Sequence, residues 1–335
     1  MRDHGGNLDW AMRQFGGEDW IDLSTGINPV AYPVGDIPAR SWEVLPTRSD
    51  MAGLSAAAQA AYRTGAQVVP LAGAQSAIQL VPYLREIGEA RILVPTYNEH
   101  AAALRHAGWP VQEISDTGSG PAARLAKLEG ADLAVVVNPN NPDGSRYSPE
   151  DLLALADKVG LLVVDESFGD TEPELSIAPQ VTKDTRNIVV MRSFGKFYGL
   201  AGVRLGFAVT GSEMAETLRG MAGPWPVPGP AIAIATRALA DQAWQSETCI
   251  RLREDAARLD ALAAKAGWRL VGGSPLFRTY STPNAEEVQR HLAERQIWSR
   301  IFPWSSDWIR LGLPAGAAQW ARLQETLAGE IAHGI

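Results

Sequence analysis

Cysteine is almost absent from this sequence, which contains only Cys249 among its 335 residues. A single cysteine excludes an intramolecular disulfide and any metal site built from several thiolates. The residues around Cys249 are typical of a helix and include no histidine, so we interpret it as a structural thiol. We therefore expect no metal site.

Long apolar runs and basic clusters are also missing. No stretch of about 18 apolar residues occurs, so we expect no transmembrane helix, and residues 1–7 lack the apolar run of a secretory signal. The formal net charge is -8 and Lys and Arg form no run, which argues against a nucleic-acid partner. These absences predict a cytoplasmic protein without a nucleic-acid or membrane partner, although a few arginines could still bind a small anionic substrate.

Hydrophobic residues are plentiful, at 46%, and occur as short runs that alternate with helical patterns. Nearly continuous apolar runs are typical of parallel strands that are covered on both faces. Such runs predict strands at residues 91–94, 133–137, 161–164, 188–191 and 205–209. Their alternation with helices predicts an α/β fold with a mostly parallel central sheet and helices on both faces.

Three local patterns predict helices around these strands. Residues 54–62 are rich in alanine, and Ser148 followed by Pro149 is typical of a helix start. The third pattern is an apolar residue at every third position from Ile78 to Ile87, which predicts one buried helix face.

The two ends of the chain differ from its middle. Residues 1–50 are rich in turn formers, which predicts an arm with little core of its own. After a Pro- and Gly-rich break, the pattern predicts a long helix over residues 231–266, two short strands, a helix capped by Asn284, a strand pair and a final helix. We therefore predict an N-terminal arm at residues 1–50 that contributes to the small domain, a large domain at 51–230, and a small C-terminal α+β domain at 231–335.

Small or polar residues stand where predicted strands end, and ligands of α/β sheets bind at such ends. Gly73-Ala74-Gln75-Ser76 precedes a helix and suits a phosphate, Tyr97 could stack on a flat cofactor, and Asn141 could bind a ligand hydroxyl. Each also has an ordinary structural explanation, as a capped turn, an exposed loop residue or a tight turn.

Two charged positions at strand ends are more informative. Asp165 and Glu166 close an apolar run, where an unpaired carboxylate is costly, so Asp165 is expected to have a cationic partner. An ion pair with an arginine is an equally simple explanation. Lys196 follows a predicted strand among glycines and aromatic residues, which can desolvate and activate an amine.

Taken in order, these residues resemble the fold-type I pyridoxal-phosphate (PLP) enzymes, the aspartate-aminotransferase-like family, over nearly the whole chain. The family pattern is a small-residue phosphate loop, a ring-stacking aromatic residue, an Asn in a turn, an Asp at a strand end, a Ser-x-x-Lys and a later Arg. The matching positions are Gly73, Ala74, Gln75, Ser76, Tyr97, Asn141, Asp165, Ser193, Lys196 and Arg204.

The resemblance implies a role for each of these residues. It makes Lys196, Asp165 and Tyr97 the catalytic residues: Lys196 binds PLP as a Schiff base and moves protons, Asp165 keeps the pyridine nitrogen protonated, and Tyr97 stacks on the ring. Asn141 binds the ring hydroxyl. The phosphate is held by Ala74 and Gln75, in the loop that starts at Gly73. Ser193 and Arg204 bind it as well. The large domain, residues 51–230, is then the PLP-binding domain.

Two positions depart from the family pattern. Phe168 stands where many relatives have a Tyr that binds the ring oxygen. Leu45 stands where many have a Tyr that reaches the phosphate of the neighbouring subunit. Both departures argue against generic transaminase activity, whereas neither removes a cofactor-binding group.

The N-terminal segments narrow the resemblance within the family. His4-Gly5-Gly6-Asn7, residues 22–29 and Asp165-Glu166-Ser167-Phe168 resemble the threonine-phosphate decarboxylases of cobalamin biosynthesis. This resemblance implies PLP-dependent decarboxylation of L-threonine O-3-phosphate, a small phosphorylated amino acid, to (R)-1-amino-2-propanol O-2-phosphate. The family's active sites lie between subunits, so the resemblance also implies a homodimer with shared sites.

A substrate with two anionic groups needs two cationic anchors. The resemblance implies that Arg310 binds the substrate carboxylate, for which a planar guanidinium is suited, and that Arg300 meets the phosphate. It also implies that His4 and Asn28 close over the substrate. The alternative interpretations are a surface position for Arg300 and a mobile terminus for His4.

Two other functions remain open at this point. A histidinol-phosphate aminotransferase shares the same framework and also takes a phosphorylated amine. A noncatalytic PLP-binding regulator would carry a DNA-binding module ahead of the PLP domain, for which we expect the short acidic arm to leave no room.

Overall fold

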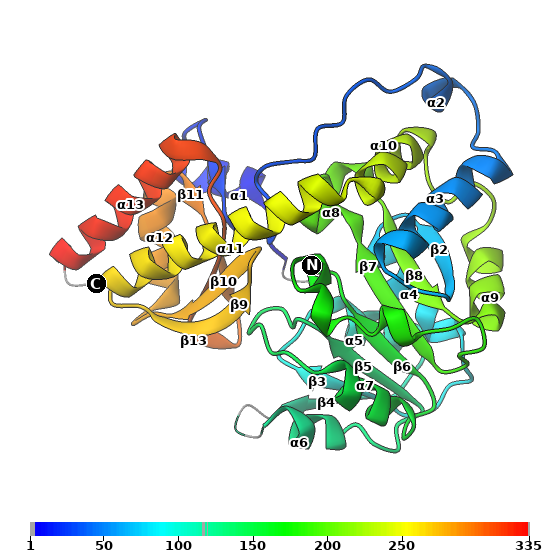
Figure 1. Cartoon of the computed structure of the whole chain (residues 1–335). Coiled ribbons are helices and arrows are strands. Elements are labelled where there is room, and N and C mark those ends of the chain that lie inside the picture. The colour runs from blue at the N-terminus through cyan, green and yellow to red at the C-terminus, as the bar shows by residue number, and fades with distance from the viewer. Residues whose placement is uncertain (1–3, 116–117, 119, 334–335) are drawn as a thin grey trace. The chain divides into compact units, whose positions relative to one another are not determined.

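Two compact units make up the chain in this computed structural model, which describes residues 4–115, 118 and 120–333 (Figure 1). Residues 1–3 of the predicted arm lie outside the described residues. One unit contains the chain up to Ala31, Pro142–Gly144 and the chain from Ser246 onward, and the other contains Tyr32–Asn141 and Ser145–Gln245. The units divide after residues 31 and 245, whereas the predicted boundaries follow residues 50 and 230. The functional division into domains stays a prediction.

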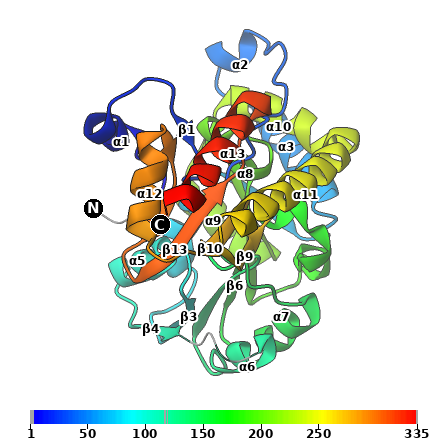
Figure 2. The ribbon, with the colours of Figure 1, turned by 90° about the vertical axis from the view of Figure 1, so that its left-hand side faces the viewer.

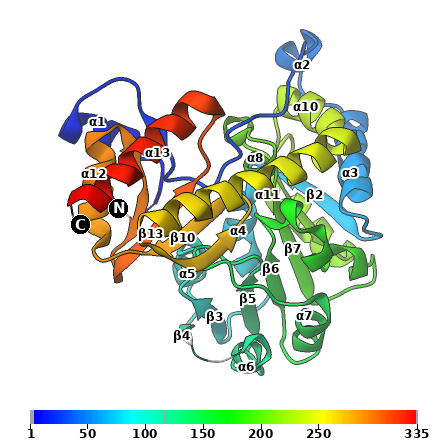
Figure 3. The ribbon, with the colours of Figure 1, turned by 60° about the vertical axis from the view of Figure 1, so that its left-hand side comes forward.

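The larger unit is built on a sheet that has seven strands in the described part of the chain. These are β2 (Gln67–Leu71), β3 (Ala90–Val94), β4 (Val111–Ser115), β5 (Leu133–Val137), β6 (Leu162–Asp165), β7 (Ile188–Ser193) and β8 (Gly206–Thr210). Their order is β2-β8-β7-β6-β5-β3-β4, and Figure 3 labels all of them except β8, which is labelled in Figure 1. Among these seven strands only β8 runs opposite to the others, so the sheet is mostly parallel, as predicted.

Two helices of the larger unit precede its first strand, and the others lie between or after the strands. They are α2 (Arg40–Glu43), α3 (Arg48–Ala61), α4 (Ala74–Leu80), α5 (Glu99–His106), α6 (Pro121–Ala126), α7 (Pro149–Ala156), α8 (Phe194–Phe197), α9 (Ser212–Ala222) and α10 (Gly229–Ala240). Ser148 caps α7 as predicted, because its side chain accepts a hydrogen bond from the backbone N–H of Asp151.

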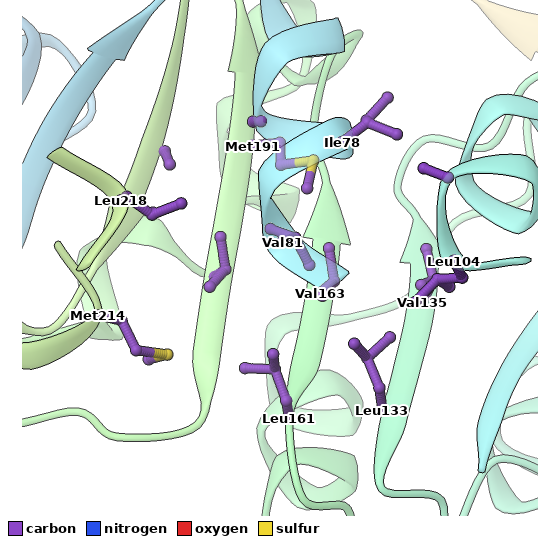
Figure 4. Packing of buried hydrophobic residues seen from close by; sticks show 14 of the residues in the cluster. Ile78, Val81, Leu104, Leu133, Val135, Leu161, Val163, Met191, Met214 and Leu218 are labelled. Atoms are coloured by element: carbon purple, nitrogen blue, oxygen red, sulfur yellow. The ribbon is translucent and has the colours of Figure 1, made fainter. Parts of the chain in front are cut away.

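Helices cover both faces of this sheet. On one face, buried residues of α4, α5 and α9 form a single cluster with the strands, and Figure 4 shows Val163 and Met191 near Ile78 and Val81. Strand residues alternate between faces, so Phe207 points away from this cluster, which contains its neighbour Ala208. On that second face the ring of Tyr62, at the end of α3, packs 5.7 Å from the ring of Phe207.

The smaller unit is an α+β structure, in agreement with the predicted pattern (Figure 2). Its main sheet has the order β12-β13-β10-β9, and a two-stranded parallel pair joins β1 to β11. The elements are α1 (Leu8–Phe15), β1 (Ile21–Asp22), most of α11 (Gln242–Lys265), β9 (Arg269–Ser274), β10 (Phe277–Ser281), α12 (Ala285–Glu294), β11 (Ile297–Trp298), β12 (Arg300–Phe302), β13 (Ser305–Gly312) and α13 (Gly316–His333).

Two predicted helices were wrong in extent. The single helix over residues 231–266 is two helices, α10 and α11, because Asp241 leaves the helical conformation between them. The helix predicted from Ile78 to Ile87 ends at Leu80 and continues only as a short 3-10 turn, and Ile87 is 62% exposed. No described helix combines the length and apolar character needed to cross a bilayer.

Candidate active site

A cavity of about 170 Å³ lies in the larger unit at the carboxyl ends of β5, β6 and β7. Ligands of parallel α/β sheets bind at such ends. The cavity is lined by every residue that the sequence predicted for the cofactor: Gly73, Ala74, Gln75, Tyr97, Asn141, Asp165, Ser193, Lys196 and Arg204. The fold thus brings together side chains that are spread over more than a hundred positions of the sequence.

Asp165 is the buried acid of this cavity, at 3% exposure. Its Oδ2 lies 2.8 Å from His100 Nε2, and its Oδ1 accepts hydrogen bonds from the N–H and the hydroxyl of Ser167, at 2.9 and 2.5 Å. Burial acts to raise the pKa of Asp165, but these hydrogen bonds outweigh it and hold the pKa below its usual value. Asp165 is therefore an anion that can pair with a cationic group of a ligand.

The buried partner of Asp165 is thus His100, not an arginine, and sequence reasoning missed it. His100 lies on α5, three residues after Tyr97, and is 3% exposed. No signal for this contact is present in the sequence, because the polar helix start Asn98-Glu99-His100 is typical of an exposed position, whereas Glu99 and His100 are buried in the structure. Ser167 was missed in the same way, since its role depends on the turn that follows β6.

Lys196 lies on the short helix α8, directly after β7, and is partly buried in the cavity wall. Its Nζ lies 5.5 Å from the centre of the Phe168 ring. The helix is anchored by aromatic stacking: the ring of Tyr198 lies 4.3 Å from Phe194 on one side and 5.6 Å from Trp244 on the other. This packing fixes the backbone that carries the amine.

The Gly73 loop and Arg204 lie side by side on another wall of the cavity. Gly73 has φ of +81°, and a Cβ there would lie 2.8 Å from Arg204 Nη2, so only glycine allows this approach. Arg204 is itself in the left-handed conformation, and its Nη1 donates to Ala201 O at 3.2 Å. No side chain caps the backbone N–H groups at the start of α4, just after Gly73. Together these donors suit an anionic group such as a phosphate.

Tyr97 and Asn141 complete the cavity from two neighbouring loops. The Tyr97 hydroxyl donates to Gln75 Oε1 at 3.2 Å, which ties the ring to the loop at Gly73. The loops after β3 and β5 are joined by a hydrogen bond of 2.6 Å from Thr96 Oγ1 to Asn140 Oδ1. The Tyr97 side chain and the loop that carries Asn141 are therefore held in position.

The residues expected to bind the substrate all belong to the smaller unit. Arg300 of β12 and Arg310 of β13 are directly opposite each other in the antiparallel pair. Arg310 is 7% exposed, and burial together with the charge of Arg300 lowers its pKa to about 10, so it remains charged at neutral pH. Its Nη2 donates to Ser24 O at 2.6 Å. Two guanidinium groups on adjacent strands make this a cationic site.

His4 and Asn28, the two arm residues, occupy different settings. Exposed His4 lines a cavity of about 740 Å³ together with Arg300. Asn28 is buried, and its Oδ1 accepts hydrogen bonds from Arg251 Nη2 at 2.7 Å and from Val30 N at 3.0 Å. The side-chain oxygen of Asn28 therefore anchors the arm.

Comparisons with known proteins find one family and several relatives that match most or nearly all of this chain. The family "Aminotransferase class I and II" matches residues 48–321. A threonine-phosphate decarboxylase of Pseudomonas aeruginosa is 42% identical over 99% of this chain and 100% of its own, and one from a Sinorhizobium species is 40% identical over 97% of each. Among solved structures, histidinol-phosphate aminotransferase from Sinorhizobium meliloti in complex with pyridoxal-5'-phosphate has a TM-score of 0.84 at 20% identity and covers 98% of this chain and 95% of its own.

The fold, the cavity and the full-length similarity agree with one another. The solved structure has the same fold, and the two decarboxylases are similar to this chain in sequence over nearly its full length. This chain belongs to the class I and II aminotransferase family, and two relatives that match it over nearly its full length are threonine-phosphate decarboxylases.

Proposed function

We propose that this protein is a PLP-dependent threonine-phosphate decarboxylase of cobalamin biosynthesis. It converts L-threonine O-3-phosphate to (R)-1-amino-2-propanol O-2-phosphate and carbon dioxide. The observation that carries the proposal is the cavity that unites all nine cofactor residues in a chain 42% identical to such an enzyme.

The residues around the cavity fit PLP. Asp165 is a buried anion, which suits a protonated ring nitrogen, and Asn141 suits the ring hydroxyl. Arg204, Ser193 and the loop at Gly73 offer donors for the phosphate. Lys196 is the amine that would hold the aldehyde carbon, and Tyr97 would stack on the ring.

Bound PLP supplies an electron-withdrawing ring for bonds at the substrate Cα. In the decarboxylation the bond between Cα and the carboxylate breaks, its electron pair stays at Cα, and carbon dioxide leaves. Lys196 then delivers a proton to Cα from its amine. Arg310 orients the carboxylate and Arg300 binds the phosphate, which decides which Cα bond breaks. His4 and Asn28 of the arm close over the substrate.

We also propose that the protein works in the cytoplasm as a homodimer with shared active sites. Trp42 and Leu45 support the dimer, because they are 67% and 60% exposed although they are large and apolar. The absence of a Tyr at Leu45 means that any contribution from the partner to the phosphate comes from another group.

Turnover assays separate the candidate functions. Purified protein is incubated with PLP and threonine phosphate, with and without 2-oxoglutarate, while carbon dioxide and glutamate are followed. Carbon dioxide that forms without a keto acid supports the decarboxylase. Glutamate formed from histidinol phosphate and 2-oxoglutarate identifies an aminotransferase instead, and PLP binding without turnover of either substrate identifies a regulator.

A further inference from the structure

A buried ionic cluster lies just outside the cavity, and the roles proposed above leave it without a function. Arg192 is 3% exposed and Glu166 is fully buried. Arg192 Nη1 donates to Glu166 Oε2 at 2.7 Å, and Nη2 donates to Asp170 Oδ1 at 2.6 Å. One guanidinium thus serves two carboxylates in an interior where isolated charges are costly.

The cluster lies on the sheet face opposite the cavity. Val189 and Met191 of β7 belong to the core cluster on the α4 side, so the alternation of strand residues turns Arg192 to the other face. There its guanidinium lies 4.4 Å from the centre of the Tyr62 ring, at the end of α3. Arg192 therefore does not line the cavity, although its neighbour Ser193 does.

The two carboxylates bracket a segment of three residues. Glu166 precedes residues 167–169 and Asp170 follows them, so Arg192 holds both ends of this turn. The near end is fixed further, because Glu166 accepts hydrogen bonds from Ser176 Oγ and Ile177 N. The far end is held by the ion pair between Asp170 and Arg192.

The bracketed turn carries two residues that face the cavity. Ser167 donates twice to Asp165 Oδ1, and the ring of Phe168 lies 5.5 Å from Lys196 Nζ. The turn also packs closely against Arg192, since a Cβ on Gly169 would lie 3.1 Å from Arg192 Nη1. The position of the turn therefore fixes one hydrogen-bonding partner of the buried acid and one neighbour of the reactive amine.

We infer that Arg192 and Asp170 are positioning residues, which hold the turn at residues 167–169 so that Ser167 and Phe168 set the electrostatic surroundings of the cofactor. This inference rests on the proposed roles of Asp165 and Lys196. It assigns a function to the second carboxylate of the Asp165-Glu166 pair, which acts through Arg192 and not through the ligand.

Asp170→Asn is the sharpest test, because it keeps the shape of the side chain and leaves the Glu166–Arg192 pair intact. Removing this carboxylate also relieves a cluster with two anions and one cation, so we expect the thermal midpoint to stay or to rise. The dissociation constant for PLP should nevertheless increase about 5-fold to 10-fold. This is the size expected when the loss of one charged hydrogen bond is partly transmitted to a neighbouring site. The visible circular dichroism of the fully loaded protein should change as well.

Glu172→Gln is the matched control. Glu172 lies two residues beyond Asp170 and forms a more exposed ion pair of similar length with Arg146, at 2.6 and 2.9 Å, but it does not bracket the turn. This variant should keep the parent's PLP affinity and visible circular dichroism. In the apoprotein, hydrogen exchange of a peptide covering residues 166–170 should increase in Asp170→Asn and not in the control.

A double-mutant cycle shows whether Asp170 acts through the turn. If Ser167→Ala is already present, adding Asp170→Asn should weaken PLP binding by less than it does in the parent. Additive effects, or an Asp170→Asn variant with the parent's affinity, dichroism and exchange, would overturn the inference. If the parent protein itself binds no PLP, the proposed function fails instead.

Discussion

At the scale of single residues, the cavity joins one reactive amine to one buried acid. Lys196 is the only lysine among its lining residues, and Asp165 is the lining carboxylate. That both residues belong to one site was predictable, because a Lys among glycines and an Asp after an apolar run are unusual positions. His100 was not predictable with the same means, since its contact with Asp165 spans 65 positions and depends on how α5 packs against β6.

Replacing Lys196 with Ala should abolish the covalent attachment of PLP and lower decarboxylation by a factor of 1,000 or more, on the order expected for loss of an essential covalent and acid–base group. Absorbance of protein passed through a desalting column measures the attached cofactor. Lys183→Ala, which removes a lysine outside the cavity lining, should leave both quantities unchanged. A Lys196→Ala protein that retained the parent's absorbance would contradict the assignment.

Replacing His100 with Phe should weaken PLP binding about 10-fold or more, because Asp165 loses a charge-assisted hydrogen bond worth roughly 1.5–3 kcal/mol. Titration of the apoprotein with PLP measures the change. His106→Phe alters an exposed histidine on the same helix and should bind PLP like the parent. Equal affinities for the two variants would exclude the proposed support of Asp165 by His100.

The same substitution should change acid stability. In the parent, the folded pKa of Asp165 lies below its unfolded value near 3.9, so the ionised group stabilises the fold above about pH 4 and this stabilisation is lost as the pH falls through the folded pKa. Without His100, burial raises the folded pKa of Asp165 toward or above its unfolded value, so this acid-dependent loss becomes smaller. The free energy of unfolding of the His100→Phe apoprotein should therefore fall less between about pH 6 and about pH 3 than that of the parent, whereas an equal fall would mean that His100 does not hold the acid ionised.

At the scale of elements, prediction succeeded where a local pattern carries the information. The buried strands β5, β6 and β7 were found within one or two residues because both of their faces are apolar. Strand β4 was missed because it is an edge strand with mostly exposed residues, and α1 was missed because its N-cap Asn7 lies among glycines typical of turns. The break between α10 and α11 was missed since Asp241 carries no helix-breaking signal of the strength of Pro or Gly.

Helix α12 illustrates a cap that is readable in both sequence and structure. The Asn284 side chain accepts hydrogen bonds from the N–H groups of Glu286 and Glu287. Replacing Asn284 with Ala should lower the free energy of unfolding by about 1 kcal/mol, measured by chemical denaturation. Asn284→Asp keeps an accepting oxygen and should restore most of this loss, and equal stability of the two variants would show that the cap contributes nothing.

At the scale of the whole molecule, the fold class and the family were predictable, and the limits of the two units were not. A unit that combines the arm, a three-residue segment at Pro142–Gly144 and the C-terminal part of the chain is discontinuous in sequence. Periodicity along a chain reports local structure, so it carries no signal for such a grouping. The proposed dimer also belongs to this scale.

Light scattering of the parent should give twice the mass of the chain. Trp42→Glu places a charge at a large apolar side chain that is 67% exposed within the chain, so we expect it to weaken the dimer at least about 10-fold, as for an interface residue of this size. Ile87→Glu alters a similarly exposed apolar residue elsewhere and should remain dimeric. A monomeric parent, or a Trp42→Glu dimer as tight as the parent, would contradict the proposed interface.

The opposed arginines of β12 and β13 couple the folding of the smaller unit to the anions around it. Arg300 and Arg310 repel each other in the free protein, and this repulsion costs free energy only in the folded state, where the two strands pair. An anion that binds between the two arginines removes this cost. By mass action, any such anion multiplies the ratio of folded to unfolded protein by one plus the anion concentration divided by its dissociation constant. If the substrate binds these two arginines as proposed, it also stabilises the folded protein, which is then least stable when its substrate is scarce.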